Sequence, residues 1–151
     1  MPFQNFNYCI VCEGLRPELG QKLTILGFFG VAPNVEIVVA NPNIPLSLSL
    51  LSGFPPVPGI LTPPYNATLT VARPDGSVAF QSPELPLQVL AGRGGILGMG
   101  VVVPPPYLGG LHSIRISVNN QIKLATTFNL RFPNPGELQG IGIRVPPGQV
   151  H

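Results

Sequence analysis

The chain has 151 residues and a net charge of only +2, with 9% of its residues charged and 44% hydrophobic. Its 20 prolines and 18 glycines make up about a quarter of the sequence, a proportion typical of disordered chains. Disorder, however, requires low hydrophobicity and high net charge, so this composition predicts a folded chain. The glycines keep no period of three, which excludes collagen, and no apolar run is long enough for a membrane span.

The length fits a single domain with an unusually small number of charges. The eight basic and six acidic residues are scattered along the chain and form no run. A basic stripe that could follow a phosphate backbone is not present in this pattern, so we expect no nucleic-acid partner. Because globular domains usually carry about a quarter charged residues, we expect either a neutral surface or one partly buried against a partner or against copies of the chain.

Alternating apolar and polar residues predict β-strands along most of the chain. In chain order, the expected strands cover residues 6–12, 22–29, 35–39, 46–51, 65–71, 77–81, 85–90, 97–103, 111–118 and 122–130. A tight turn is expected at Pro74-Asp75-Gly76, because proline cannot continue a ladder and Asp-Gly tolerates the positive φ of a hairpin. Asn119-Asn120 is expected to turn the chain back in the clearest hairpin of the sequence.

No window shows the 3.6-residue period of a helix. Eight to ten short strands separated by Pro- and Gly-rich bridges predict an all-β fold, an antiparallel β-sandwich. A small β-barrel or jelly roll is the alternative. We expect the sandwich to occupy residues 1–131.

The last segment, residues 132–151, is a Pro/Gly-rich tail with a short pattern of its own. After Pro133-Asn134-Pro135 breaks the preceding strand, Ile141, Ile143 and Val145 alternate with other residues. One interpretation is a frayed tail or a last edge strand. The other is an arm that adds a strand to a neighbouring copy, which makes Ile141, Ile143 and Val145 candidates for an interface.

No group of residues predicts catalysis, a metal site or a cofactor site. Cys9 and Cys12 are three apart in a predicted strand, which places their side chains on opposite faces and too far apart for a disulfide. A closed zinc site needs four ligands, and the further candidates, His112 and His151, are unrelated in spacing. The glycine-rich stretch 92–100 lacks both the dinucleotide fingerprint and the Gly-Lys-Ser/Thr of a phosphate loop. We therefore predict a protein that is not an enzyme and holds no metal or cofactor.

The segment 12–29, CEGLRPELGQKLTILGFF, resembles the opening of a bacterial family known only as a domain of unknown function. Members begin with a strand ending in Cys and acidic residues, followed by Arg-x-Glu, a Gly/Lys turn and a strand running into Gly and an aromatic residue. The segments 73–76 and 109–111 are also similar to that family, whereas Gly14 departs from its acidic pattern. The resemblance, which covers residues 6–130, implies a small cytosolic immunoglobulin-like β-sandwich and no assigned activity.

Four polar residues in this opening form a candidate polar patch: Glu13, Arg16, Glu18 and Lys22. They flank a predicted connection between two core strands, where Lys22 can meet either Glu13 or Glu18. The alternatives are an ordinary exposed ion pair, which adds little stability, and a small recognition surface.

Together these observations predict a non-enzymatic β-sandwich that acts as a structural, assembly or protein-interaction module and forms homo-oligomers, with Tyr107 as a further interface candidate. The alternative is a ligand-binding module for a saccharide or peptide, using Tyr65 or Tyr107 at a loop at the end of the sandwich. A third alternative is an enzyme using His112 or Cys12, although neither has partner groups. The N-terminus lacks the features of a secretory signal, so the expected location is the cytoplasm, and a virion or other particle is a compatible setting.

Overall fold

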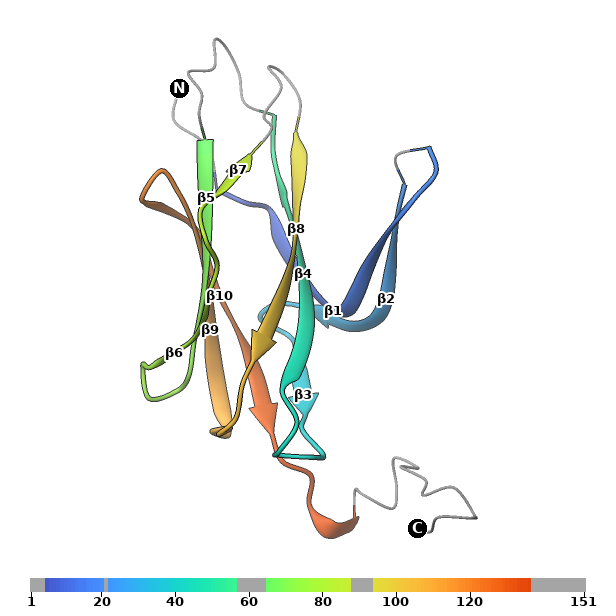
Figure 1. Ribbon diagram of the computed structural model, residues 1–151, viewed down its shortest axis with the longest axis vertical. Coiled ribbons are helices and arrows are strands. Elements are labelled where there is room, and N and C mark those ends of the chain that lie inside the picture. Colours follow the sequence, from blue (N-terminus) through green and yellow to red (C-terminus); the bar gives the residue numbers. More distant parts are fainter. Residues whose placement is uncertain (1–4, 21, 57–64, 88–93, 137–151) are drawn as a thin grey trace.

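The computed structural model describes residues 5–20, 22–56, 65–87 and 94–136, which form two β-sheets packed face to face (Figure 1). One sheet has the strand order β2-β1-β4-β8, and the other has the order β3-β10-β9-β5-β6, with β7 also paired to β5. The strands are β1 (Tyr8–Glu18), β2 (Lys22–Val31), β3 (Glu36–Val38), β4 (Leu46–Phe54), β5 (Tyr65–Ala72), β6 (Val78–Gln81), β7 (Leu85–Leu87), β8 (Gly95–Val103), β9 (Gly110–Val118) and β10 (Gln121–Arg131). The predicted all-β sandwich is confirmed, and over the described residues the two sheets do not close into the barrel considered as its alternative.

The strand topology is immunoglobulin-like. β1 lies beside β4 in one sheet, whereas β3 lies beside the last strand, β10, in the other. β4 and β8 are neighbours in the first sheet, and β5, β9 and β10 are neighbours in the second. β3 runs parallel to β10, which departs from the antiparallel arrangement that we predicted. The parallel pair forms because the chain changes sheets between β2 and β3, so that β3 meets β10 without a connecting hairpin.

A tyrosine corner completes this topology. Tyr107 precedes β9, and its hydroxyl lies 3.1 Å from the carbonyl oxygen of Val103, four residues upstream. The same hydroxyl also donates to the carbonyl of Ile44, so the side chain ties two connections together. Immunoglobulin-like sandwiches use a tyrosine at this corner in the same way.

The core lies between the sheets and consists of alternate residues of each strand. Leu48 and Leu50 point inward from β4, and Ile114 and Ile116 point inward from β9. All four are almost fully buried, as the period-two pattern of their segments predicts. Burying a side chain of this size stabilises the fold by about 1.5–3 kcal/mol.

The structure confirms both predicted hairpin turns. Asn119 and Asn120 have φ angles of 49° and 67°, the two positive values that a type I′ turn requires. Gly76 has a φ of 91° in the turn between β5 and β6. In the same turn the Asp75 carboxylate accepts hydrogen bonds from the backbone N–H of Ser77 at 2.9 Å and from its hydroxyl at 2.6 Å.

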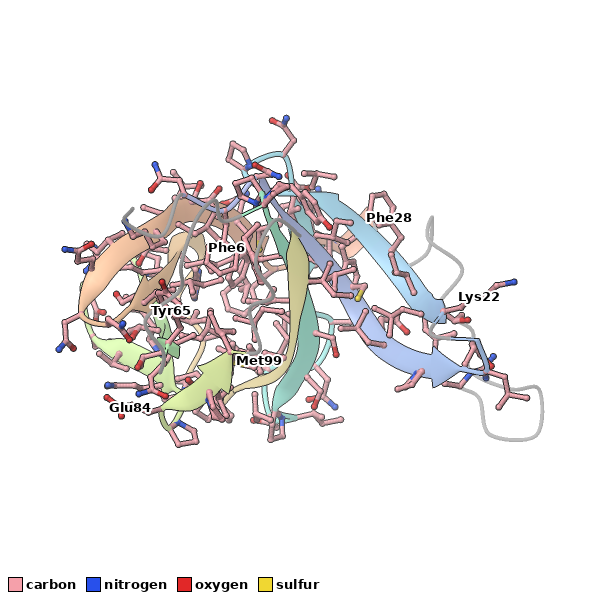
Figure 2. All side chains as sticks on the ribbon, turned by 90° about the horizontal axis from the view of Figure 1, so that it is seen from above. Phe6, Lys22, Phe28, Tyr65, Glu84 and Met99 are labelled. Carbon is pink, nitrogen blue, oxygen red and sulfur yellow. The ribbon has the colours of Figure 1, made fainter. Side chains whose placement is uncertain are left out.

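β1 and β2 continue beyond the sandwich as a hairpin arm, which we define as residues 13–28. Among the described residues, β1 pairs with β4 from Tyr8 to Cys12, and from there to Glu18 it pairs with β2 alone. A bulge after Val11 shifts the register and twists the ribbon away from the sheet. Figures 1 and 2 show the arm standing apart from the rest of the molecule. The prediction that this strand ends at residue 12 is therefore wrong.

Candidate functional site

The hairpin arm has an apolar face and a mixed face. The cross-strand pairs Leu15–Ile25 and Pro17–Leu23 share one face of the ribbon, because paired residues of an antiparallel ladder point the same way. Alternation along the strands places Arg16, Glu18, Thr24 and Phe28 on the other. In Figure 2 Phe28 lies on the side of the arm away from β8.

The apolar face of the arm and the outer surface of β4 and β8 enclose a groove of about 310 Å³. The groove is lined by Leu15, Pro17, Leu23, Ser49, Leu51, Ile96, Gly98, Met99 and Gly100. Two glycines keep its floor open. A Cβ on Gly98 would lie 3.0 Å from Leu15 Cδ1, and a Cβ on Gly100 would extend into empty space.

β8 forms both the floor of this groove and the edge of the four-stranded sheet. Within the described residues, β8 pairs with β4 and has no partner strand on its other side. Its sequence, GILGMGVVV, holds no charged residue and no proline, the usual devices that protect an edge strand. Ile96 and Val102 are exposed on it. This surface of the molecule therefore combines an apolar groove with a free, uncharged strand edge.

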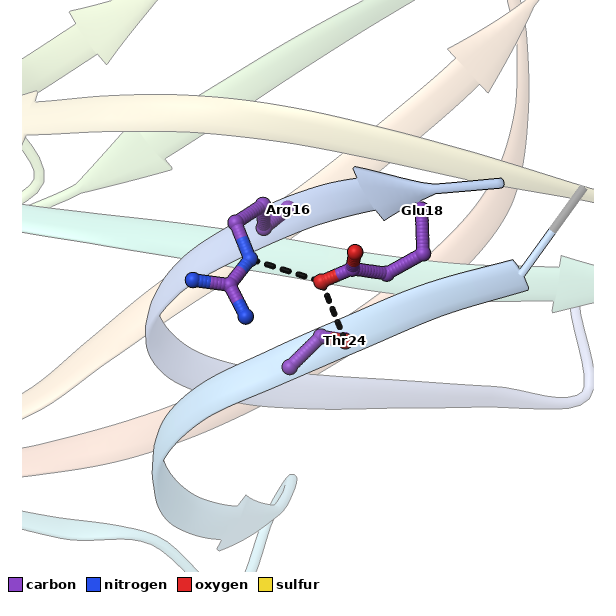
Figure 3. A network of polar contacts seen from close by, with 3 residues as sticks. All are labelled: Arg16, Glu18 and Thr24. Carbon is purple, nitrogen blue, oxygen red and sulfur yellow. Dashed lines mark hydrogen bonds and ion pairs between the residues drawn. The ribbon is translucent and has the colours of Figure 1, made fainter.

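Three of the four predicted patch residues come together on the mixed face of the arm. Arg16 Nε donates to Glu18 Oε1 at 2.7 Å, and Thr24 Oγ1 donates to the same oxygen at 3.0 Å (Figure 3). Lys22 stands opposite Glu18 in the β1–β2 register. Arg16 and Glu18 occupy positions within β1 rather than flanking a connection as we predicted, whereas Lys22 begins β2, where a strand was predicted. Because the ion pair is exposed, it adds at most about 1 kcal/mol to stability.

The fourth patch residue, Glu13, lies apart from the other three. Its side chain covers Gly27, where an added Cβ would come within 2.5 Å of the Glu13 Cδ. Gly27 has a φ of 61°, a conformation that glycine adopts without strain. Glu13 therefore packs over a glycine of β2, while Arg16 and Glu18 point to the opposite face.

The two tyrosines proposed as contact residues, Tyr65 and Tyr107, pack within the sandwich. Tyr107 is 8% exposed, and its hydroxyl is held at the corner described above. Tyr65, at the start of β5, is half-buried and packs against the core. Neither ring is an open platform for a saccharide. The remaining interface candidates lie outside the described residues: Ile141, Ile143 and Val145.

Both cysteines are free and fully buried. Burial raises the pKa of Cys9 to about 11. Burial also raises the pKa of Cys12, whose thiol lies 3.4 Å from the carbonyl of Gly14 and 3.5 Å from that of Ser49. Both groups are therefore protonated thiols at neutral pH, which are weak nucleophiles.

His112 is also part of the core. Its ring stacks on Phe128 with the centroids 5.1 Å apart, and its Nδ1 lies 3.2 Å from the carbonyl oxygen of Gly110. Burial lowers the pKa of His112, and the hydrogen bond to Gly110 opposes this shift in part. The residue is 0% exposed, so its imidazole is neutral and has no open side toward a substrate.

Two further kinds of feature do not occur in the part of the chain that the structure describes. No three side chains of His, Cys, Asp or Glu gather there to hold a metal ion. No helix there is long and apolar enough to cross a membrane.

Comparison with known proteins does not assign a family. No family model and no curated protein matches the chain. Among solved structures, the alkylpurine DNA glycosylase AlkC of Pseudomonas fluorescens, bound to DNA containing an abasic site analog, shares 14% sequence identity at a TM-score of 0.41. The similarity covers 64% of this chain and 27% of the glycosylase chain. A likeness this distant identifies no function, and the family resemblance of the N-terminal segment stays a prediction.

The groove was not predicted from the sequence. One sequence signal for the floor of the groove is present in β8. Its two middle outward-facing positions, Gly98 and Gly100, are glycines, and larger residues stand before and after them on the same face. The wall formed by Leu15 and Leu23 has no local signal, because it depends on β1 continuing past Cys12.

Proposed function

We propose that this protein is a non-enzymatic assembly module that associates with copies of itself through the outer surface of its four-stranded sheet. The supporting observation is the concentration of exposed apolar side chains on that sheet. Five lie on both faces of β2 and at the tip of the arm, with exposures of 38–95%: Leu19, Ile25, Leu26, Phe28 and Val31. Ile96 and Val102 add to them from the opposite edge, β8. Apolar surface of this extent beside a groove is typical of a contact site.

Charge does not oppose such a contact. The arm carries two acidic and two basic residues, which cancel: Glu13, Glu18, Arg16 and Lys22. β4 and β8 carry no charged residue at all. Two copies can therefore approach through this surface without net repulsion, and removal of apolar area from water drives the association.

A pair of matched substitutions tests the proposal. Ile96 on β8 is 57% exposed and Leu111 on β9 is 59% exposed, and the two belong to different sheets. Ile96→Asp places a charge in the proposed contact, whereas Leu111→Asp places the same charge on the outer face of the other sheet. We expect Ile96→Asp to shift the mass measured by light scattering toward the 16.0 kDa monomer. Leu111→Asp should keep the wild-type mass, and both variants should keep the far-UV spectrum of a β-sheet protein.

Two results would overturn the proposal. One is a wild-type chain that stays at 16.0 kDa up to about 1 mM, a concentration at which even an association of about 4 kcal/mol is detected. The other is an assembly that Leu111→Asp dissociates and Ile96→Asp leaves intact, which would place the contact on the six-stranded sheet.

A further inference from the structure

We propose that residues 140–145 of one copy add as a strand to the free edge of β8 in a second copy, with their apolar side chains beside the groove. This inference rests on the proposed function and names the segment that makes the contact. It combines three observations: an acceptor edge, a space next to that edge, and a chain that leaves the sandwich past the end of the sheet.

β8 is the edge best suited to accept a strand. The edge strands of the six-stranded sheet, β3, β6 and β7, have only three or four residues each. β2 is longer, but it is twisted into the arm, begins with Lys22 and has positive φ at Gly27 and Gly30. β8 offers nine residues without charge or proline. Strand addition uses the main-chain groups of such an edge for affinity and the neighbouring side-chain spaces for specificity.

The space beside β8 matches the pattern of the tail. The outward-facing residues of β8 are Ile96, Gly98, Gly100 and Val102, so the middle of the edge has no side chains on that face. In the sequence of the tail, Ile141, Ile143 and Val145 alternate with Gly142 and Arg144, and alternate residues of an added strand would share one face. Large side chains of an added strand would then lie next to the glycines of β8 and cover the groove. Cross-strand packing of this kind stabilises neighbouring strands.

The described part of the chain leads the tail away from its own sandwich. β10 ends at Arg131, and Pro133 and Pro135 follow. Figure 1 shows this segment, up to residue 136, continuing past the end of the sheet instead of turning back over it. β10 lies next to β3, whereas β8 is at the other side of the sandwich, in contact with β6. A second copy can receive the tail without the reversal that its own β8 would require.

The test uses full-length variants with matched charges. Ile141→Asp/Ile143→Asp places two carboxylates on the apolar face of the tail, and Gln139→Asp/Gln149→Asp adds the same charge outside that segment. We expect the first variant to weaken association by about 100-fold or more and the second by less than about threefold. In the wild type, hydrogen exchange of the β8 amides should be at least about tenfold slower than in Ile141→Asp/Ile143→Asp. The amides of β2 and β6 should exchange equally in both.

The outcomes separate this inference from the proposed function. A monomeric wild type with rapidly exchanging β8 amides overturns both. If Ile96→Asp dissociates the assembly while Ile141→Asp/Ile143→Asp changes neither mass nor exchange, the tail is not the contact and only the inference is wrong. A monomeric wild type with protected β8 amides means that the tail folds onto its own β8, which also overturns exchange between copies. Protection that moves from β8 to β2 overturns the choice of acceptor.

Discussion

Replacing Tyr107 with phenylalanine isolates the contribution of the tyrosine corner. The substitution keeps the buried ring, which is 8% exposed, and removes only the hydroxyl. That hydroxyl contacts the carbonyl oxygens of Val103, the last residue of β8, and of Ile44, in the connection before β4. A neutral hydrogen bond contributes about 1 kcal/mol, and a buried acceptor left without a donor costs about 1–3 kcal/mol. We therefore expect Tyr107→Phe to lower the free energy of unfolding by about 1–3 kcal/mol.

Urea unfolding at one fixed protein concentration measures this loss. With an m-value of about 2 kcal/mol/M, the midpoint should fall by roughly 0.5–1.5 M while the slope stays unchanged. Tyr8→Phe is the control, because the Tyr8 ring and hydroxyl lie over Gly53 on the first sheet, and its loss should stay within about 0.5 kcal/mol. Equal midpoints for Tyr107→Phe and the wild type would refute the corner as a source of stability. A larger loss in Tyr8→Phe would refute the assignment of the hydrogen bonds.

Three more predictions concern buried groups. Because burial lowers the pKa of His112, the unfolded chain takes up its proton first, and the wild type should lose unfolding free energy as the pH falls below the ordinary value of 6.5. Denaturation between about pH 7.5 and about pH 5.5 should show a smaller loss for His112→Phe. Gly53→Ala places a Cβ 2.5 Å from the Tyr8 ring, so it should cost about 1–3 kcal/mol, and a double-mutant cycle with Tyr8→Ala should recover part of that cost. Cys9 and Cys12 should react slowly with a thiol reagent in the native protein and completely after unfolding; rapid labelling of the native protein would contradict their burial.

The sequence predicts the sandwich well because most of its strands have one buried apolar face and one exposed polar face. Each segment such as 65–71 or 111–118 buries one face and exposes the other, which produces the period of two from local residues alone. The Asn119-Asn120 turn is also local, since its two positive φ angles are carried by residues that tolerate them. Fold class and most strands therefore follow from short-range information.

The hairpin arm does not follow from short-range information. Residues 13–18 include Glu13, Arg16, Pro17 and Glu18, and this composition is typical of a connection. The segment is nevertheless a strand, because β2 pairs with it along one side. Among the described residues its other side has no partner strand. Proline is tolerated where a strand has a free side, since its missing N–H leaves no ladder bond unmade. The parallel pairing of β3 with β10 is equally non-local.

The arm and the scarcity of charge together favour an interface. Leu19 at the arm tip is 95% exposed and Phe28 is 61% exposed, so neither side chain adds much to the stability of a single copy. The same bulge that separates the arm from the sheet creates a groove whose wall, at Leu15, and floor, at Gly98, are uncharged. In an isolated domain this apolar area stays exposed to water and adds no stabilising free energy. Contact with another chain would bury the area and contribute to the free energy of binding. The proposed association through the four-stranded sheet would therefore give these residues an energetic role that the fold of one copy does not.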